Sequence, residues 1–152
     1  MEVMNNTTTL EEVFAQRRDY WIKWVDDMST LVKTMDGLLT LQSEIYARRQ
    51  EAVENYHNLT ATLAKQTKIY KERYNEIYNR IRVLKIPNTP NFVYGTEPAL
   101  RNQVEGELSQ EKYIIDIIEN HISYMDQTIK TIDGLIYTIS NRIKIEEIKM
   151  GR

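Results

Sequence analysis

The chain has 152 residues, of which 41% are hydrophobic and 28% are charged, and its formal net charge is −2. It has no cysteine, which excludes disulfides, thiolate nucleophiles and cysteine-ligated zinc. A chain so close to neutral has no overall field toward nucleic acid or an anionic membrane, so such an interaction needs a local patch. Five Gly and three Pro are few, so the composition predicts one all-α domain, over residues 9–150.

The N-terminal residues 1–8 are polar and lack the regions of a signal peptide, so we expect a flexible lead. Thr9 and Glu12 have the spacing of a capping box, which predicts a helix from about Leu10. No apolar run approaches the roughly 18 residues of a membrane-spanning helix. We therefore expect a cytoplasmic protein with no membrane partner.

The first long element is predicted over 9–86 as one helix or two helices end to end. Steps of seven from Phe14 keep mostly apolar side chains on one stripe, as in a coiled coil. A companion stripe contains Val25, Val32, Leu39, Tyr46, Val53, Tyr74 and Ile81. A break near Gly37 or within residues 60–67 is left open.

The second long element follows a turn-rich connection. Pro87 ends the first helix, and the residues over 87–97 favour turns. A second helix is predicted over 98–149. Two long helices joined by a short connection indicate an antiparallel helical hairpin of coiled-coil type.

The second helix has isoleucine at most of the a and d positions of a sustained heptad pattern. A lone helix with such a stripe needs partners from its own chain, other copies, or both. Isoleucine at both positions favours homo-oligomers above dimers, such as a bundle or ring. The candidate interface residues are Ile115, Ile118, Ile122, Met125, Ile129, Ile132, Ile136 and Ile139.

Catalytic and metal motifs are missing, so we expect no enzyme, no metal and no cofactor. Glu54 and His57 have the Glu-x-x-His spacing of a di-iron bundle, but a second such motif is absent, and His121 is the only other histidine. The chain has neither a phosphate-binding glycine loop nor a nucleophile motif. Trp21 and Trp24 favour a core or subunit interface over a membrane patch, because they share the apolar stripe.

A local basic stretch is the most suggestive feature. Residues 65–85 contain seven basic and two acidic residues, a net of +5, with tyrosines interleaved. Basic residues hold a phosphate backbone and aromatic rings stack on bases when single strands are bound without sequence preference. The candidate residues are Lys68, Tyr70, Lys71, Arg73, Tyr74, Tyr78, Arg80, Arg82 and Lys85.

An alternative explains the same stretch without nucleic acid. Residues 97–126 contain seven acidic and two basic residues, a net of −5. In an antiparallel hairpin this acidic stretch lies beside the basic one. The two would neutralise each other while the tyrosines pack between the helices.

A family resemblance comes from the C-terminal helix. The string Ile139-Ser140-Asn141-Arg142 and the flanking isoleucines are similar to the final helix of the UvsY-type recombination mediators of tailed phages. The acidic segment that precedes this string in the second helix also resembles that family. So does the basic and aromatic end of the first helix. The likeness covers residues 65–150, while the family's paired aromatics followed by glycine have no clean match.

The resemblance implies a function. Such proteins form ring-like homo-oligomers, bind single-stranded DNA, and help load a recombinase onto strands covered by a single-strand-binding protein. The resemblance also implies that the protein acts in the cytoplasm of an infected bacterial host and needs no catalytic residues.

A second hypothesis is a structural coiled-coil protein of a virion or scaffold, with no nucleic-acid role. Under the mediator hypothesis, the basic side chains of the stretch face solvent. Under the structural hypothesis they pair with Glu105, Glu107 and Glu111.

Overall fold

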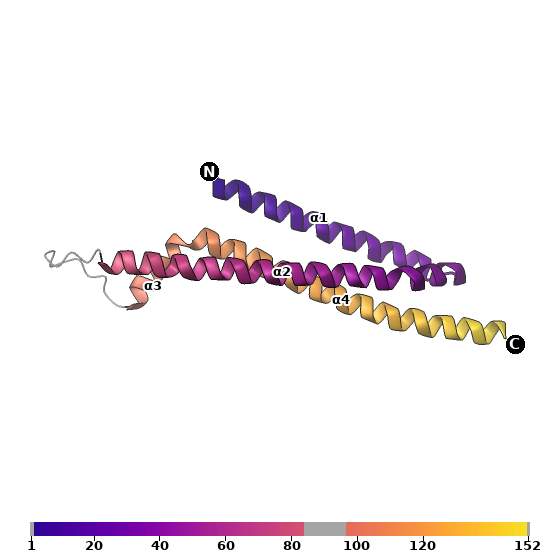
Figure 1. Cartoon of the computed structure of the whole chain (residues 1–152). Helices are drawn as coiled ribbons and strands as arrows, with labels where there is room; N and C mark the ends of the chain where they lie inside the picture. Colours follow the sequence, from indigo (N-terminus) through magenta and orange to yellow (C-terminus); the bar gives the residue numbers. More distant parts are fainter. Residues whose placement is uncertain (1, 84–96, 152) are drawn as a thin grey trace. The chain divides into compact units, whose positions relative to one another are not determined.

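Four helices make up nearly all of the chain that the computed structural model describes, which is residues 2–83 and 97–151. They are α1 (Glu2–Leu31), α2 (Met35–Val83), α3 (Glu97–Glu107) and α4 (Ser109–Met150) (Figure 1). No strand occurs among the described residues, so the predicted all-α fold is confirmed. The connection predicted over 87–97 lies outside the described residues, except for Glu97, which opens α3.

The start of α1 differs from the prediction. The helix begins at Glu2, so the predicted start near Leu10 is wrong, while the flexibility expected of residues 1–8 stays a prediction. The Thr9–Glu12 pair lies inside α1 and does not cap it. Neither proline nor glycine occurs in residues 2–8, so nothing in the backbone stops the helix from extending.

The helices divide into two compact units. The first contains residues 1–60 and 120–152, with α1, the first half of α2 and most of α4. The second contains residues 61–119, with the rest of α2, all of α3 and the start of α4. None of the described helices is long and apolar enough to cross a membrane.

The turn between α1 and α2 occupies Val32–Thr34, beside the break that was left open at Gly37 (Figure 1). Thr34 caps α2, because its Oγ1 accepts a hydrogen bond from the backbone N–H of Gly37 at 3.0 Å. Gly37 packs directly against the end of α1, where no side chain would fit. From Met35 onward α2 continues unbroken, so the second possible break, within residues 60–67, does not occur.

In the first unit α1 and α4 run in the same direction. The Phe14 ring stacks on the His121 ring with centroids 4.2 Å apart. Farther along both helices, Arg142 Nη1 donates a hydrogen bond to the carbonyl oxygen of Val32. This bond satisfies a carbonyl at the C-terminal end of α1, where a positive charge also complements the helix dipole.

Helix α2 runs against both of these helices in the first unit. Arg49 Nε and Asp133 Oδ1 form an ion pair of 2.6 Å between α2 and α4. Buried apolar side chains from all three helices fill the space between them: Phe14, Trp21, Met28, Leu38, Leu41, Ile45, Ala52, Leu59, Met125, Ile132, Ile139 and Ile143. Trp21 is thus a core residue, as predicted.

The predicted companion stripe is wrong over the first half of α2. Leu39 and Tyr46 were placed on it, but they are 47% and 61% exposed, while Leu38 and Ile45 are buried. The turn at Val32–Thr34 resets the helical phase. Counting by sevens across that turn therefore misplaces the first half of α2 by one residue, or about 100° around its axis.

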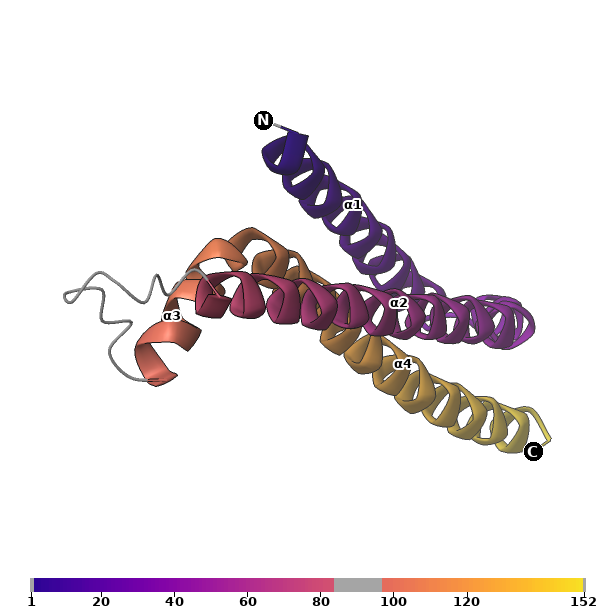
Figure 2. The same cartoon turned by 60° about the vertical axis from the view of Figure 1, so that its left-hand side comes forward.

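The second unit has its own core, between α2 and the chain that returns through α3 and α4. Its buried members are Ile77, Ile81, Leu100, Val104 and Leu108. Leu108 interrupts the single helix predicted over 98–149, and α3 meets α4 there at an angle (Figure 2). The interruption is local, because Leu108 N still donates to Val104 O and Lys112 N to Leu108 O, at 3.1 and 2.9 Å.

Candidate nucleic-acid interface

The basic stretch lies on the second half of α2, and its two central arginines are paired. Arg73 Nη1 contacts Glu111 Oε1 of α4, and Arg80 Nη2 lies 2.8 Å from Glu107 Oε2 of α3. The Arg73 and Arg80 side chains are still 51% and 59% exposed. These are the pairs that the structural hypothesis predicted for Glu107 and Glu111.

The three tyrosines of the stretch pack inside the second unit. Tyr70, Tyr74 and Tyr78 are partly buried against the apolar core between α2 and α3–α4. The rings of Tyr74 and Tyr78 stack on one another, with centroids 6.4 Å apart and planes 14° apart. Part of their ring surface is therefore engaged within the chain.

Hydrogen bonding and burial also affect the phenols of this row. Tyr78 OH donates to Glu97, 2.8 Å from Oε1 and 2.9 Å from Oε2, and this bond is the main reason that the pKa of Tyr78 is raised. The pKa of Tyr70 is raised mainly by burial and secondarily by the charge of Glu105. Both tyrosines thus stay neutral near pH 7 and stabilise the unit as hydrogen-bonded or packed side chains.

A second group of basic side chains lies on a different face of α2. At about 100° per residue, Lys68, Lys71 and Arg82 fall within about 60° of one another, and about 120° or more from Arg73 and Arg80. All three are exposed. Lys71 and Arg82 form no ion pair within the described part of the chain, and Lys68 has only a 3.9 Å contact with Glu72. We call these three residues the lysine–arginine face.

Of the nine predicted contact residues, Lys85 lies outside the described residues. The others separate into the paired arginines, the packed tyrosines and the lysine–arginine face. In the sequence all nine belong to one basic stretch with interleaved tyrosines. The acidic stretch neutralises the side of α2 that faces it, which carries Arg73 and Arg80. The lysine–arginine face points elsewhere and, among the described residues, is not neutralised by that stretch.

The predicted oligomer interface is mostly interior to a single chain. Ile115, Ile118, Met125, Ile132 and Ile139 are buried, with exposed fractions of 5% or less, and Ile122, Ile129 and Ile136 are partly buried. The five buried side chains are covered by this chain and are not available to another copy. The isoleucine stripe was correctly identified as a packing face, but it packs on other helices of the same chain.

Exposed apolar side chains occur elsewhere on the first unit. Tyr46 on α2 is 61% exposed and Tyr137 on α4 is 71% exposed. They lie one turn from Arg49 and Asp133, which pair across the two helices, so both tyrosines flank the same seam. Sequence reasoning missed this surface because the heptad count had placed Tyr46 on the core stripe.

No candidate metal-binding site occurs among the described residues. No group of three or more His, Asp or Glu side chains there is arranged to hold a metal ion. Glu54 accepts a hydrogen bond from Gln50 Nε2 at 3.3 Å, and His57 lies on the exposed surface of α2.

His121 is a different case, because it is only 1% exposed and neither ring nitrogen has a hydrogen-bond partner among the described residues. Burial, assisted by the charges of Arg17 and Arg18, lowers its pKa to about 4. The ring is thus neutral near pH 7 and serves as a flat core side chain against Phe14. The available sequence signal was its spacing, three residues after Ile118 and four before Met125, which puts it on the packing face of the helix.

Comparison with known proteins does not place the chain in a family. No protein-family model matches the chain, and neither a curated protein nor a solved structure matches it.

Proposed function

We propose that this chain is a non-enzymatic single-stranded DNA-binding protein that binds the strand through the lysine–arginine face of α2. The observation that supports the proposal is that Lys71 and Arg82 form no ion pair within the described residues, while Lys68 has only a long one. From Lys68 to Arg82 the face extends about 21 Å along the helix. Such a row of exposed cations attracts a phosphate backbone without reading sequence.

The paired arginines are a secondary part of this surface. Ion pairs between exposed side chains are worth about 1 kcal/mol or less. Arg73 and Arg80 can therefore exchange a glutamate for a phosphate at small cost. The tyrosines contribute to the proposal only by holding α2 in place.

The wider role that we propose is that of a recombination mediator, acting with a recombinase and a single-strand-binding protein in the cytoplasm of an infected bacterial host. This part rests on the resemblance of residues 65–150 to the UvsY-type family. Homo-oligomerisation above the dimer belongs to the same proposal. It would multiply the lysine–arginine face and raise affinity through multivalency.

The experiment titrates the protein into a fluorescently labelled single-stranded oligonucleotide and follows anisotropy at several salt concentrations. We compare the wild type with Lys68→Gln, Lys71→Gln and Arg82→Gln combined. Each removed phosphate contact should lower the slope of log affinity against log salt by about 0.7, so the triple variant should lose about 2 units of slope.

A matched control removes the same charge from the first unit, at the exposed side chains Lys23, Lys33 and Lys144. The control should bind nearly as tightly as the wild type. Equal losses in both variants would mean that only total charge matters, and the proposed face would be wrong. No binding by the wild type at low salt would refute DNA binding altogether.

The second candidate function is a structural helical protein of a virion or scaffold. The pairs Arg73–Glu111 and Arg80–Glu107 favour it, because they use the basic stretch to join α2 to α3 and α4. Under this function the wild type forms a stable assembly, measured by sedimentation, and does not bind the oligonucleotide.

A further inference from the structure

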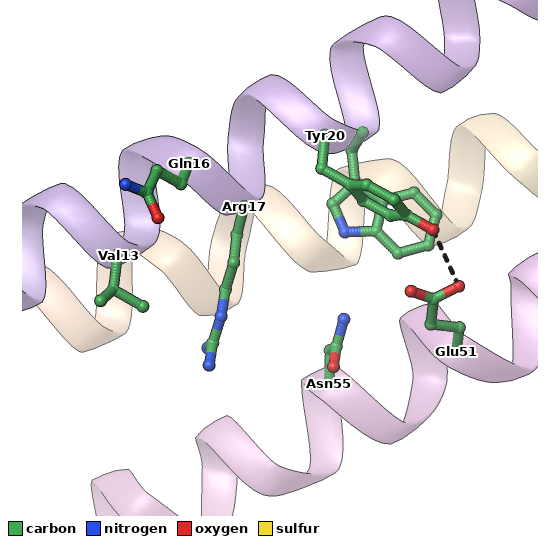
Figure 3. Close-up of a pocket in the computed structure, with 7 residues that line it drawn as sticks. Val13, Gln16, Arg17, Tyr20, Glu51 and Asn55 are labelled. Atoms are coloured by element: carbon green, nitrogen blue, oxygen red, sulfur yellow. Dashed lines mark hydrogen bonds between the residues drawn. The ribbon is translucent and has the colours of Figure 1, made fainter.

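A polar pocket of about 370 Å³ lies between α1 and α2 in the first unit, remote in sequence from the lysine–arginine face. Val13, Gln16, Arg17 and Tyr20 line it from α1, and Glu51 and Asn55 line it from α2 (Figure 3). The Trp21 side chain, which is almost completely buried, also contributes to the lining. A volume near the lower end of the usual range for ligand pockets suits one small group.

The charge inside this pocket is unbalanced. Tyr20 OH donates to Glu51 Oε2 at 3.1 Å, and Arg48 Nη1 lies 2.9 Å from the same oxygen. The negative charge of Glu51 is therefore already compensated. Arg17 forms no ion pair with any carboxylate of the described residues, and its recorded contact is with the Phe14 ring, whose centroid lies 5.6 Å away.

The remaining polar side chains of the pocket have no hydrogen-bond partner among the described residues: Arg17 can only donate, whereas the amides of Gln16 and Asn55 can both donate and accept. Figure 3 shows the Arg17 side chain extending from α1 toward α2, with the Asn55 side chain projecting from α2 into the same space beside it. Neither Asn55 nor Gln16 has a side-chain hydrogen bond to another described residue. The Arg17 guanidinium and the Asn55 amide both carry N–H donors beside this space, which is a pattern that recognises a carboxylate.

From these observations we infer that the pocket between α1 and α2 binds a carboxylate of an acidic peptide segment from a partner protein. The carboxylate accepts hydrogen bonds from Arg17 and Asn55, while an adjoining apolar side chain contacts Val13. The inference does not depend on the proposed DNA binding.

The test uses the full chain and two matched probes, acetyl-Leu-Asp-amide and its neutral isostere acetyl-Leu-Asn-amide. Binding is followed by NMR, through the Arg17 side-chain Nε–H signal and the backbone amide of Asn55. We expect saturable shifts of both signals with the aspartate probe and at least tenfold weaker binding of the asparagine probe.

Two variants and one control make the result specific. Arg17→Gln should weaken binding of the aspartate probe at least tenfold, and Asn55→Asp should do the same by placing a competing carboxylate beside Arg17. Arg18→Gln removes an equal charge from the neighbouring residue, which does not line the pocket, and should leave binding unchanged.

Three outcomes would overturn the inference. Equal binding of both probes would remove the role of the carboxylate, and equal losses in the Arg17 and Arg18 variants would reduce the effect to general charge. Inorganic phosphate binding more tightly than the aspartate probe would show a general anion site in place of a peptide site. Circular dichroism of each variant establishes that the helices are intact.

Discussion

Gly37 lies so close to Leu31 that a Cβ atom on it would overlap the Leu31 carbonyl oxygen. Real Cβ atoms do not approach a backbone oxygen so closely. The contact is made by the start of α2 against the end of α1, so it sets how tightly the two helices can turn.

Replacing Gly37 with alanine is therefore expected to lower the free energy of unfolding by about 2 kcal/mol or more, because the backbone has to shift. Chemical denaturation followed by circular dichroism measures the change. Gly134→Ala is the matched control: its added Cβ has nothing within 4 Å, so it should raise stability by about 0.5–1 kcal/mol. If both variants were stabilised, the turn would not have the tight geometry described.

His121 makes stability depend on pH. Its folded-state pKa of about 4 lies below the value of about 6.5 for an unfolded histidine, so the unfolded chain binds more protons between these values. The contribution of neutral His121 is complete above pH 6.5 and is lost as the pH falls toward 4. The loss is on the order of 3 kcal/mol.

The variant His121→Phe keeps a flat ring against Phe14 and removes the titrating group. The difference in unfolding free energy between it and the wild type should grow as the pH falls from 6.5 to 4. Carboxylates titrate in both proteins, so their effect cancels in this difference. A difference that stays constant with pH would contradict the burial of His121.

Neutralising the carboxylates that pair with the two arginines should strengthen DNA binding. In Glu107→Gln with Glu111→Gln, the charges of Arg73 and Arg80 are no longer compensated, which should tighten single-stranded DNA binding about fivefold at low salt. Stability should fall by about 1 kcal/mol or less per pair. The control is Glu44→Gln with Glu119→Gln, two exposed glutamates with no ion pair among the described residues. Equal gains in both variants would show only an effect of net charge.

The exposed tyrosines that flank the Arg49–Asp133 seam should support self-association. Replacing Tyr46 and Tyr137 with serine removes two large apolar side chains from a surface that the chain itself leaves open. We expect a lower mass in sedimentation at the same concentration, with unchanged helix content. Ile22→Ser with Ile69→Ser, which are also exposed, should keep the wild-type mass. An unchanged mass in the tyrosine variant would place any assembly on another surface.

The sequence predicted well what depends on local pattern. The all-α fold, the isoleucine packing face of α4 and the burial of Trp21 follow from apolar periodicity and from the scarcity of glycine and proline. The break beside Gly37 was a recognised possibility. Its position became definite only with the cap by Thr34 and the contact with Leu31, which are tertiary features.

The sequence predictions are wrong where a helix could pack against more than one partner. Periodicity shows that Ile118 and Ile132 pack, but it does not distinguish another helix of the chain from another copy. The sequence grouped Arg73 and Lys71 in one basic stretch, yet the return of the chain through α3 and α4 pairs Arg73 and leaves Lys71 exposed. The pocket at Arg17 gave no sequence signal, because it is formed by residues from two helices.

Arg142 is the last residue of the Ile-Ser-Asn-Arg string on which the resemblance to recombination mediators depends. Its guanidinium joins α4 to the carbonyl end of α1, next to the turn into α2. The last residue of the string therefore has a structural role, which is to connect α4 to the end of α1. A chain sharing these four residues is expected to share this corner of the fold, whereas affinity for a nucleic acid has to be established from the side chains of its own α2.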